Sequence, residues 1–170
     1  MKKILQLLFE HKTLDRTAAK EVLMHIGQGI YNEHEVTAFM TVFLMRSITI
    51  EELQGFQDAL MELCVKADLK DFETIDIVGT GGDGKNTFNI STIACFIVAG
   101  AGQMVAKHGN YGASSISGAS NVMEALGYRF SNDNEKLKRE MEIANICFLH
   151  APLFHPALKV VGPIRKNLAM

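Results

Sequence analysis

The stretch DIVGTGGDGKNTFNIST, residues 76–92, decides the fold. Residues 75–78 form a short β-branched apolar run that is typical of a buried strand. Five of the six residues 79–84 are Gly or Thr, and residues 90–99 then have the apolar pattern of a helix. The segment MVAKH at 104–108 predicts a second short strand. The order strand, Gly loop, helix, strand indicates a parallel α/β sheet.

The Gly loop is suited to holding a phosphate group. Glycine permits positive φ and brings main-chain N–H groups close to an anion, and the helix behind the loop adds orphan donors and the positive end of its dipole. Asn89, Ser91 and Thr92 open that helix with side-chain donors, and Asp83 is suited to recruit a cation or a ribose hydroxyl. The alternative interpretation is a ligand-free turn in which Asn89 is an ordinary N-cap.

The loop matches neither familiar nucleotide-binding motif. A P-loop would place Ser or Thr after Gly84 and Lys85, but Asn86 stands there. No G-x-G-x-x-G with an acidic residue about 20 positions later fits the spacing either.

A second polar loop, KHGNYGASSISGAS at 107–120, follows the second predicted strand. Parallel strands end at one edge of a sheet, where α/β folds bind ligands, so both loops are expected to face one cleft. The alternative interpretation makes Lys107 a solvated surface charge, His108 a structural histidine bonded to the backbone and the serines an ordinary loop.

The first 67 residues predict four helices, because apolar residues recur there at helical spacing. These residues are Ile4, Leu7 and Leu8; Val22, Leu23 and Ile26; Val36, Phe39, Met40, Phe43 and Leu44; and Leu53, Phe56, Leu60 and Leu63. Thr49 and Glu52 form a capping-box pattern at the start of the fourth helix. Further helices are expected at 119–126 and 134–144, a third strand at 146–150, and a linker at 66–74.

Composition narrows the classes of function. The net charge of -2 and the pI near 6.3 argue against a nucleic-acid partner. Three widely spaced cysteines in apolar surroundings favour reduced thiols and a cytoplasmic location. The N-terminal MKKILQLLFEHK lacks the features of a signal peptide. The apolar run at 93–102 is about half of the roughly 20 residues that a membrane span requires, so no membrane partner is expected.

Four motifs together resemble the anthranilate phosphoribosyltransferase family over the whole chain: GTGGD at 79–83, NIST at 89–92, KHGN at 107–110 and GPIRK at 162–166. The resemblance implies an N-terminal four-helix domain, residues 1–67, through which members form homodimers. It also implies that residues 75–170 are the first, incomplete part of a parallel α/β phosphoribosyltransferase domain. The implied reaction joins anthranilate to phosphoribosyl pyrophosphate with Mg²⁺ and releases pyrophosphate, in tryptophan biosynthesis.

The resemblance also assigns site residues by position. Arg165 would face the anthranilate carboxylate, Ser91 would be a Mg²⁺ ligand, and Lys107 would be the catalytic cation that neutralises the leaving pyrophosphate. The implied anthranilate contacts are Gly79, Asn110 and Arg165. The implied phosphoribosyl pyrophosphate contacts are Gly79, Gly82, Asp83, Thr87, Asn89, Ile90, Ser91, Thr92, Lys107 and Ala119.

Two departures from the family pattern affect these expectations. Tyr111 stands where many members have Arg, and Ala119 stands where many have Ser, so local phosphate contacts are expected to differ. The family's Asp-Glu pair for Mg²⁺ has no counterpart, and the chain ends shortly after Arg165, at about half of the family length. We therefore expect an N-terminal portion without activity of its own.

Two alternative functions remain at this point. One is a pyrimidine nucleoside phosphorylase, which shares the helical-plus-α/β plan and a Gly-Thr-Gly-Gly loop but uses inorganic phosphate. The other is a non-catalytic fragment that associates with itself through its helices.

Overall fold

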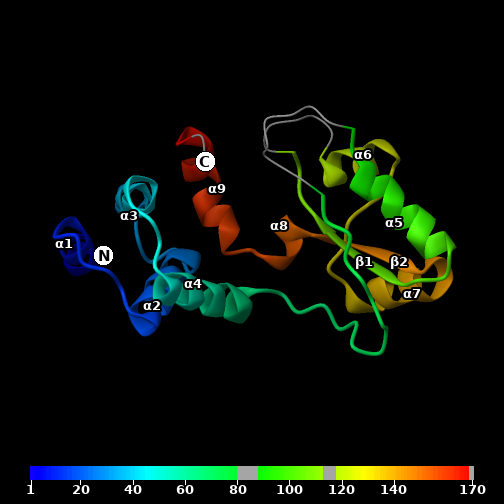
Figure 1. Cartoon of the computed structure of the whole chain (residues 1–170), viewed down its shortest axis with the longest axis horizontal. Coiled ribbons are helices and arrows are strands. Elements are labelled where there is room, and N and C mark those ends of the chain that lie inside the picture. The colour runs from blue at the N-terminus through cyan, green and yellow to red at the C-terminus, as the bar shows by residue number, and fades with distance from the viewer. Residues whose placement is uncertain (80–87, 113–117, 169–170) are drawn as a thin grey trace. The chain divides into compact units, whose positions relative to one another are not determined.

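The computed structural model describes residues 1–79, 88–112 and 118–168, and the chain divides into two compact units. The helical unit comprises Met1–Cys64 with the segment from His155 onward, and the α/β unit comprises Val65–Phe154. Figure 1 shows the elements of both along the chain. The predicted class, an N-terminal helical part followed by a parallel α/β part, is confirmed.

The helical unit contains the four expected helices. They are α1 (Lys2–Phe9), α2 (Arg16–Gly27), α3 (Glu33–Met45) and α4 (Ile50–Leu63). Asp15 and Asn32 cap α2 and α3, and Thr49 and Glu52 form the expected capping box at the start of α4. Among the described residues, no helix is long and apolar enough to cross a membrane.

A further helix, α9 (Leu158–Asn167), packs with these helices and was not predicted from the sequence. Its buried residues Val161 and Ile164 join the same apolar core as Val22 of α2 and Val36 of α3. The segment after residue 154 therefore belongs to the helical unit, whereas the sequence placed it in the α/β domain.

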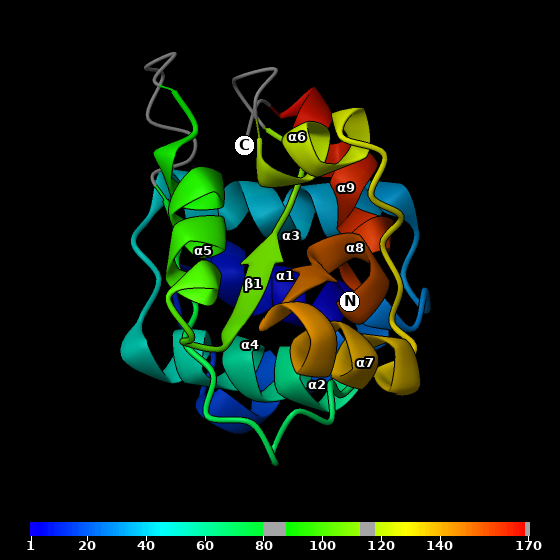
Figure 2. The ribbon, with the colours of Figure 1, turned by 90° about the vertical axis from the view of Figure 1, so that its right-hand side faces the viewer.

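Among its described residues, the α/β unit contains the parallel strands β1 (Val105–Gly109) and β2 (Ile146–His150), paired from Val105↔Ile146 to Gly109↔His150. The helices described beside them in Figures 1 and 2 are α5 (Ile90–Gly100), α6 (Ala119–Ala125), α7 (Asn134–Ala144) and α8 (Ala151–Phe154).

The two strands are covered on both faces, and successive side chains along each strand point to opposite faces. Cys95 of α5 packs with Val105 and Phe148, while Met141 of α7 packs with Cys147 from the opposite face. This is the arrangement expected for parallel strands, because both of their faces must be buried.

The expected strand at 75–78 is wrong beyond its first residue. Ile75 makes one isolated parallel bridge to β1. In a continued ladder, the N–H of His108 would donate to the carbonyl of Ile77, but it donates instead to Oδ1 of Asp76 at 3.3 Å. A side-chain acceptor has replaced the main-chain acceptor, so the ladder stops there.

The expected linker at 66–74 packs onto the α/β unit. Leu69 and Phe72 lie against the cluster that contains Met141. The N–H of Asp68 donates to Oδ1 of Asn134 at 2.8 Å, and the Asp68 carboxylate pairs with Lys138 at 2.8 Å.

Candidate functional site

Gly79 lies directly against the first turn of α5. A Cβ atom at this position would overlap the Oγ atom of Ser91, so any larger residue would force the Ser91 hydroxyl or the loop to move. The chain thus brings the start of the Gly loop to the N-terminus of a helix, where main-chain N–H groups favour anions.

The first turn of α5 is capped by Asn89, whose Oδ1 accepts the N–H of Thr92 at 3.1 Å. Ile90 has an exposed side chain, which leaves its main chain as the group suited to a polar ligand. Thr92 is 1% exposed, and its Oγ1 atom makes no hydrogen bond with any described residue. Of these three residues, Thr92 is therefore the least accessible candidate contact.

Lys107 lies in β1 and is only 3% exposed, which contradicts its interpretation as a solvated surface charge. Its Nζ atom donates to the carbonyl of His108 at 2.8 Å, and it makes no ion pair with any described residue. Burial raises the pKa of the nearby Cys95 thiol, and the Lys107 charge partly offsets that effect. A buried ammonium without a carboxylate partner is suited to meet the charge of an anionic ligand.

His108 binds a carboxylate, which neither interpretation of the sequence foresaw. Its main-chain N–H and its ring Nδ1 both contact the side chain of Asp76, through Oδ1 and Oδ2 respectively. Asp76 therefore joins the segment before the Gly loop to the strand that carries Lys107. Asp76 was not singled out from the sequence, although it is the first residue of the stretch that decides the fold.

Asn110, the candidate anthranilate contact, follows β1 directly. Its Oδ1 atom accepts the N–H of Tyr111 at 2.8 Å, and its carbonyl accepts the N–H of Ser120 at 3.2 Å. The amide nitrogen of its side chain is then the donor left for a ligand. Ala119 lies close by, because a Cβ added to Gly109 would be 3.0 Å from the Ala119 Cβ atom.

The described candidate residues of the α/β unit lie near one edge of its strands. Ile75 forms a parallel bridge to Val105 of β1, and the segments that follow these two residues carry Gly79 and Asn110 respectively. Lys107 lies in β1 itself. Such an edge is where α/β folds bind ligands.

Two models of known protein families match this chain. The family model described as "Glycosyl transferase family, a/b domain" matches residues 71–170, and the model of its helical bundle domain matches residues 2–64. The chain belongs to this glycosyl transferase family.

Curated relatives in this glycosyl transferase family include two proteins named anthranilate phosphoribosyltransferase. The one from Flavobacterium johnsoniae is 61% identical over 170 residues, which cover 100% of this chain and 52% of the relative. The one from Bacteroides thetaiotaomicron is 62% identical, with 100% and 51% covered. The chain spans about half the length of the curated relatives it matches, and the resemblance seen in its four motifs is confirmed.

Solved structures of the glycosyl transferase family agree with the fold. The anthranilate phosphoribosyltransferase from Thermus thermophilus matches with a TM-score of 0.82 at 31% identity, over 98% of this chain and 50% of that one. The enzyme from Saccharomyces cerevisiae, in complex with PRPP and Mg, matches with a TM-score of 0.80 at 27% identity, again over 98% and 50%.

Four of the positions implied by the family resemblance do not belong to the described part of the α/β unit. Gly82, Asp83 and Thr87 lie outside the described residues. Arg165 is exposed in the last turn of α9 and belongs to the helical unit, whereas the other described candidates belong to the α/β unit.

Ser91 is the described residue that the family resemblance assigns to Mg²⁺. The described residues hold no group of three or more His, Cys, Asp or Glu side chains that could bind a metal ion. Mg²⁺ is usually held by one or two carboxylates together with substrate phosphates and water. The Ser91 hydroxyl offers one uncharged oxygen ligand, and the described residues add no carboxylate cluster to it.

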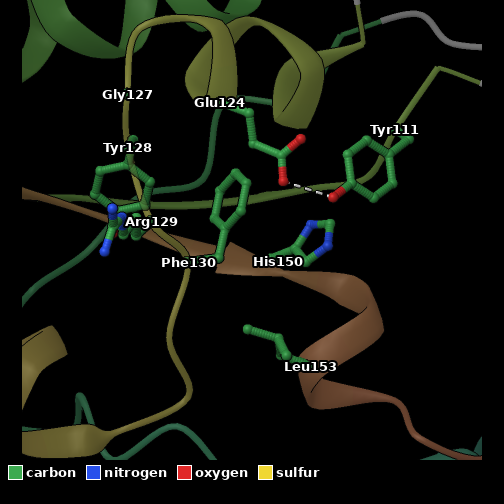
Figure 3. Close-up of a pocket in the computed structure, with 8 residues that line it drawn as sticks. All are labelled: Tyr111, Glu124, Gly127, Tyr128, Arg129, Phe130, His150 and Leu153. Carbon is green, nitrogen blue, oxygen red and sulfur yellow. Dashed lines mark hydrogen bonds between the residues drawn. The ribbon is translucent and has the colours of Figure 1, made fainter.

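A pocket of about 580 Å³ is lined by Tyr111, the residue that follows Asn110, and by seven further residues. The sequence analysis did not predict this pocket. Figure 3 shows Tyr111, Glu124, Phe130 and His150 converging on it from different segments. The lining is completed by Gly127, Tyr128, Arg129 and Leu153. Burial lowers the pKa of His150, which favours its neutral ring. The lining comes from separate stretches of the sequence, around residues 111, 124–130 and 150–153, which meet only in the tertiary fold.

Proposed function

We propose that the protein containing this chain transfers the phosphoribosyl group of phosphoribosyl pyrophosphate to the amine of anthranilate, with release of pyrophosphate, in tryptophan biosynthesis. The observation that carries this proposal is the 61% identity over all 170 residues to a protein of that name. The described site residues support the proposal, because they offer an anion-binding helix N-terminus and a buried cation.

The phosphate groups would bind at the start of α5. Gly79 allows the loop to pass against Ser91, and the N-terminus of α5 offers main-chain donors and its dipole to an anion. Bound Mg²⁺ would neutralise charge on the departing pyrophosphate, and Ser91 would help to hold it.

Lys107 would neutralise pyrophosphate as its bond to C1 of the ribose breaks. Its ammonium is buried, and no described carboxylate competes for it. A fixed charge in a site shielded from water stabilises developing negative charge more strongly than the same charge in water.

Besides Gly79, the family resemblance assigns Asn110 and Arg165 to anthranilate. The free amide donor of Asn110 follows β1, and the Arg165 guanidinium is suited to a bidentate pair with the carboxylate. The aniline nitrogen then attacks C1 and loses a proton. This reaction needs no covalent nucleophile, so positioning and electrostatics supply the rate.

We further propose a cytoplasmic homodimer that pairs through its helices. Apolar side chains are exposed at the end of α3 and the start of α4: Leu44, Met45, Ile48, Ile50 and Leu53. Several exposed apolar side chains within ten residues of the chain support an interaction surface at this place. Light scattering of the wild-type protein should give twice the monomer mass. The double variant Met45→Glu, Ile50→Glu should give the mass of the monomer. A monomeric wild type would contradict this part of the proposal.

A chimera tests the activity directly. Residues 1–170 replace the matched half of the Flavobacterium johnsoniae relative, and loss of anthranilate fluorescence is followed after phosphoribosyl pyrophosphate and Mg²⁺ are added. We expect turnover by the chimera and none by residues 1–170 alone. A folded chimera without turnover would contradict the proposal, and phosphate-dependent cleavage of uridine or thymidine would indicate a nucleoside phosphorylase instead.

A further inference from the structure

We propose that Tyr111 is a positioning residue for anthranilate: its hydroxyl and ring fasten the segment after β1 to α6 and to the end of β2, and this fixes the direction of the Asn110 amide. The inference rests on the proposed function for the identity of the substrate. The attachment itself is a feature of the α/β unit alone.

The Tyr111 side chain is held at two points. Its hydroxyl donates to Oε1 of Glu124 in α6 at 2.7 Å. Its ring meets the ring of His150, at the end of β2, edge to face with the centroids 4.9 Å apart. Figure 3 shows the Tyr111 side chain beside both partners, with its hydroxyl bonded to Glu124 and its ring near His150.

His150 is itself held firmly. Its Nδ1 atom lies 2.8 Å from Oγ of the buried Ser120 at the start of α6, and its ring stacks on Phe130 at 4.5 Å. His150 is 6% exposed and Ser120 is 2% exposed. Tyr111 therefore packs against a rigid support rather than against a mobile surface side chain.

The main chain around Tyr111 is fastened to the same helix. The N–H of Gly112 donates to Oδ1 of Asn121 at 2.9 Å, and the N–H of Ser120 donates to the carbonyl of Asn110 at 3.2 Å. A Cβ atom on Gly118 would overlap the backbone of Gly112, so the two segments are in close contact.

This attachment bears on Asn110 through one hydrogen bond. The N–H of Tyr111 donates to Oδ1 of Asn110, so the position of Tyr111 determines where the amide nitrogen of Asn110 points. Loosening Tyr111 should let this amide rotate, and the loss should fall on the substrate that Asn110 contacts.

The test uses Tyr111→Phe in the chimera, with Tyr31→Phe as the control. The Tyr31 hydroxyl also makes a side-chain hydrogen bond, 3.1 Å from Nδ1 of His25, but it belongs to the helical unit and not to the pocket that Tyr111 lines. Glu124→Gln keeps an acceptor for the Tyr111 hydroxyl and Glu124→Ala removes it. Steady-state kinetics for both substrates and amide hydrogen exchange are measured for each variant.

We expect Tyr111→Phe and Glu124→Ala to raise the KM for anthranilate by about threefold to tenfold, with kcat changed less, as the loss of one hydrogen bond predicts. The amides of Gly112 and Ser120 should exchange faster in the same two variants. Glu124→Gln and Tyr31→Phe should resemble the wild type in both measurements. An unchanged anthranilate KM in Tyr111→Phe, or an equal rise in Tyr31→Phe, would overturn the inference.

The two proposals fail in different ways. An inactive chimera contradicts the proposed function, and the hydrogen exchange then decides whether Tyr111 fastens the segment. Faster exchange of Gly112 and Ser120 confined to Tyr111→Phe and Glu124→Ala would support the attachment, and unchanged exchange would overturn it.

Discussion

Asp76 binds His108 through both oxygens of its carboxylate, with Oδ1 accepting the main-chain N–H at 3.3 Å and Oδ2 contacting ring Nδ1. The pair links the segment that leads into the Gly loop to β1, which carries Lys107. The two halves of the proposed phosphate site are thus joined by one carboxylate.

Asp76→Ala should loosen this link. We expect it to destabilise the α/β unit by about 1 kcal/mol, since the pair is partly exposed, and to raise the KM for phosphoribosyl pyrophosphate more than that for anthranilate. Thermal unfolding and steady-state kinetics of the chimera measure both effects. Asp71→Ala removes the same charge at an exposed position nearby and serves as the control. Equal behaviour of the two variants would mean that the Asp76 link has no role in binding.

Arg46 and Glu52 form a bidentate pair that holds the helical unit together. Glu52 is fully buried and also accepts the N–H of Leu14 at 3.0 Å. Arg46→Ala leaves a buried carboxylate without its cation, so unfolding in urea should show a loss of about 3–5 kcal/mol. Arg16→Ala breaks the exposed pair with Asp58 and should cost much less. A similar cost for both variants would contradict this account.

The same pair predicts an acid-labile helical unit. Burial alone would raise the pKa of Glu52, but hydrogen bonds from Arg46, Thr49 and Leu14 outweigh it and lower the pKa from 4.5 to about 2. Because the folded-state pKa lies below the ordinary value, the carboxylate stabilises the fold fully above about pH 4.5. This contribution, about 3 kcal/mol, is lost as the pH falls toward 2. Urea unfolding between pH 7 and pH 3 should show the loss in the wild type and a flatter dependence in Glu52→Gln.

Gly79→Ala should weaken phosphoribosyl pyrophosphate binding by about tenfold or more, because the new Cβ would displace Ser91 or the loop. Calorimetric titration of the chimera measures this directly. Gly100→Ala is the matched control, since a Cβ there meets no atom within 4 Å. Unchanged affinity in Gly79→Ala would remove the start of the Gly loop from the site. Gly81→Val and Gly82→Val are expected to abolish binding, and both positions lie outside the described residues.

The regular elements with strong local signals could be predicted from the sequence. Periodic apolar residues and the Thr49 capping box located α4, and α7 begins and ends at the predicted residues, 134 and 144. These features succeed because each depends on residues within one or two turns of the chain.

Elements that depend on distant partners were missed. The expected strand at 75–78 does not continue beyond Ile75, because the Asp76 side chain accepts the N–H of His108 that a continued ladder would bond to a main-chain carbonyl. This hydrogen bond depends on the tertiary contact between Asp76 and His108. The helix α9 was not predicted, although Leu158, Val161 and Ile164 have helical spacing. Pro163, a residue that usually interrupts helices, lies inside it. The pocket around Tyr111 and His150 could not be predicted, because its residues meet only in the folded unit.

Arg165→Ala should raise the KM for anthranilate by about tenfold to a hundredfold, as the loss of a charge-assisted hydrogen bond predicts, and should affect phosphoribosyl pyrophosphate far less. Lys166→Ala removes a neighbouring charge from the same last turn of α9 and is the control. Equal effects of Arg165→Ala on both substrates would indicate that Arg165 has a structural role.

Lys107 provides the most direct test of the proposed reaction, through the initial rate of product formation by the chimera. The account predicts turnover by the wild-type chimera, a loss of about a hundredfold or more in Lys107→Met, and partial activity in Lys107→Arg, which keeps the charge. Circular dichroism and thermal unfolding verify that the variants fold. A folded Lys107→Met chimera with the wild-type rate would contradict the account.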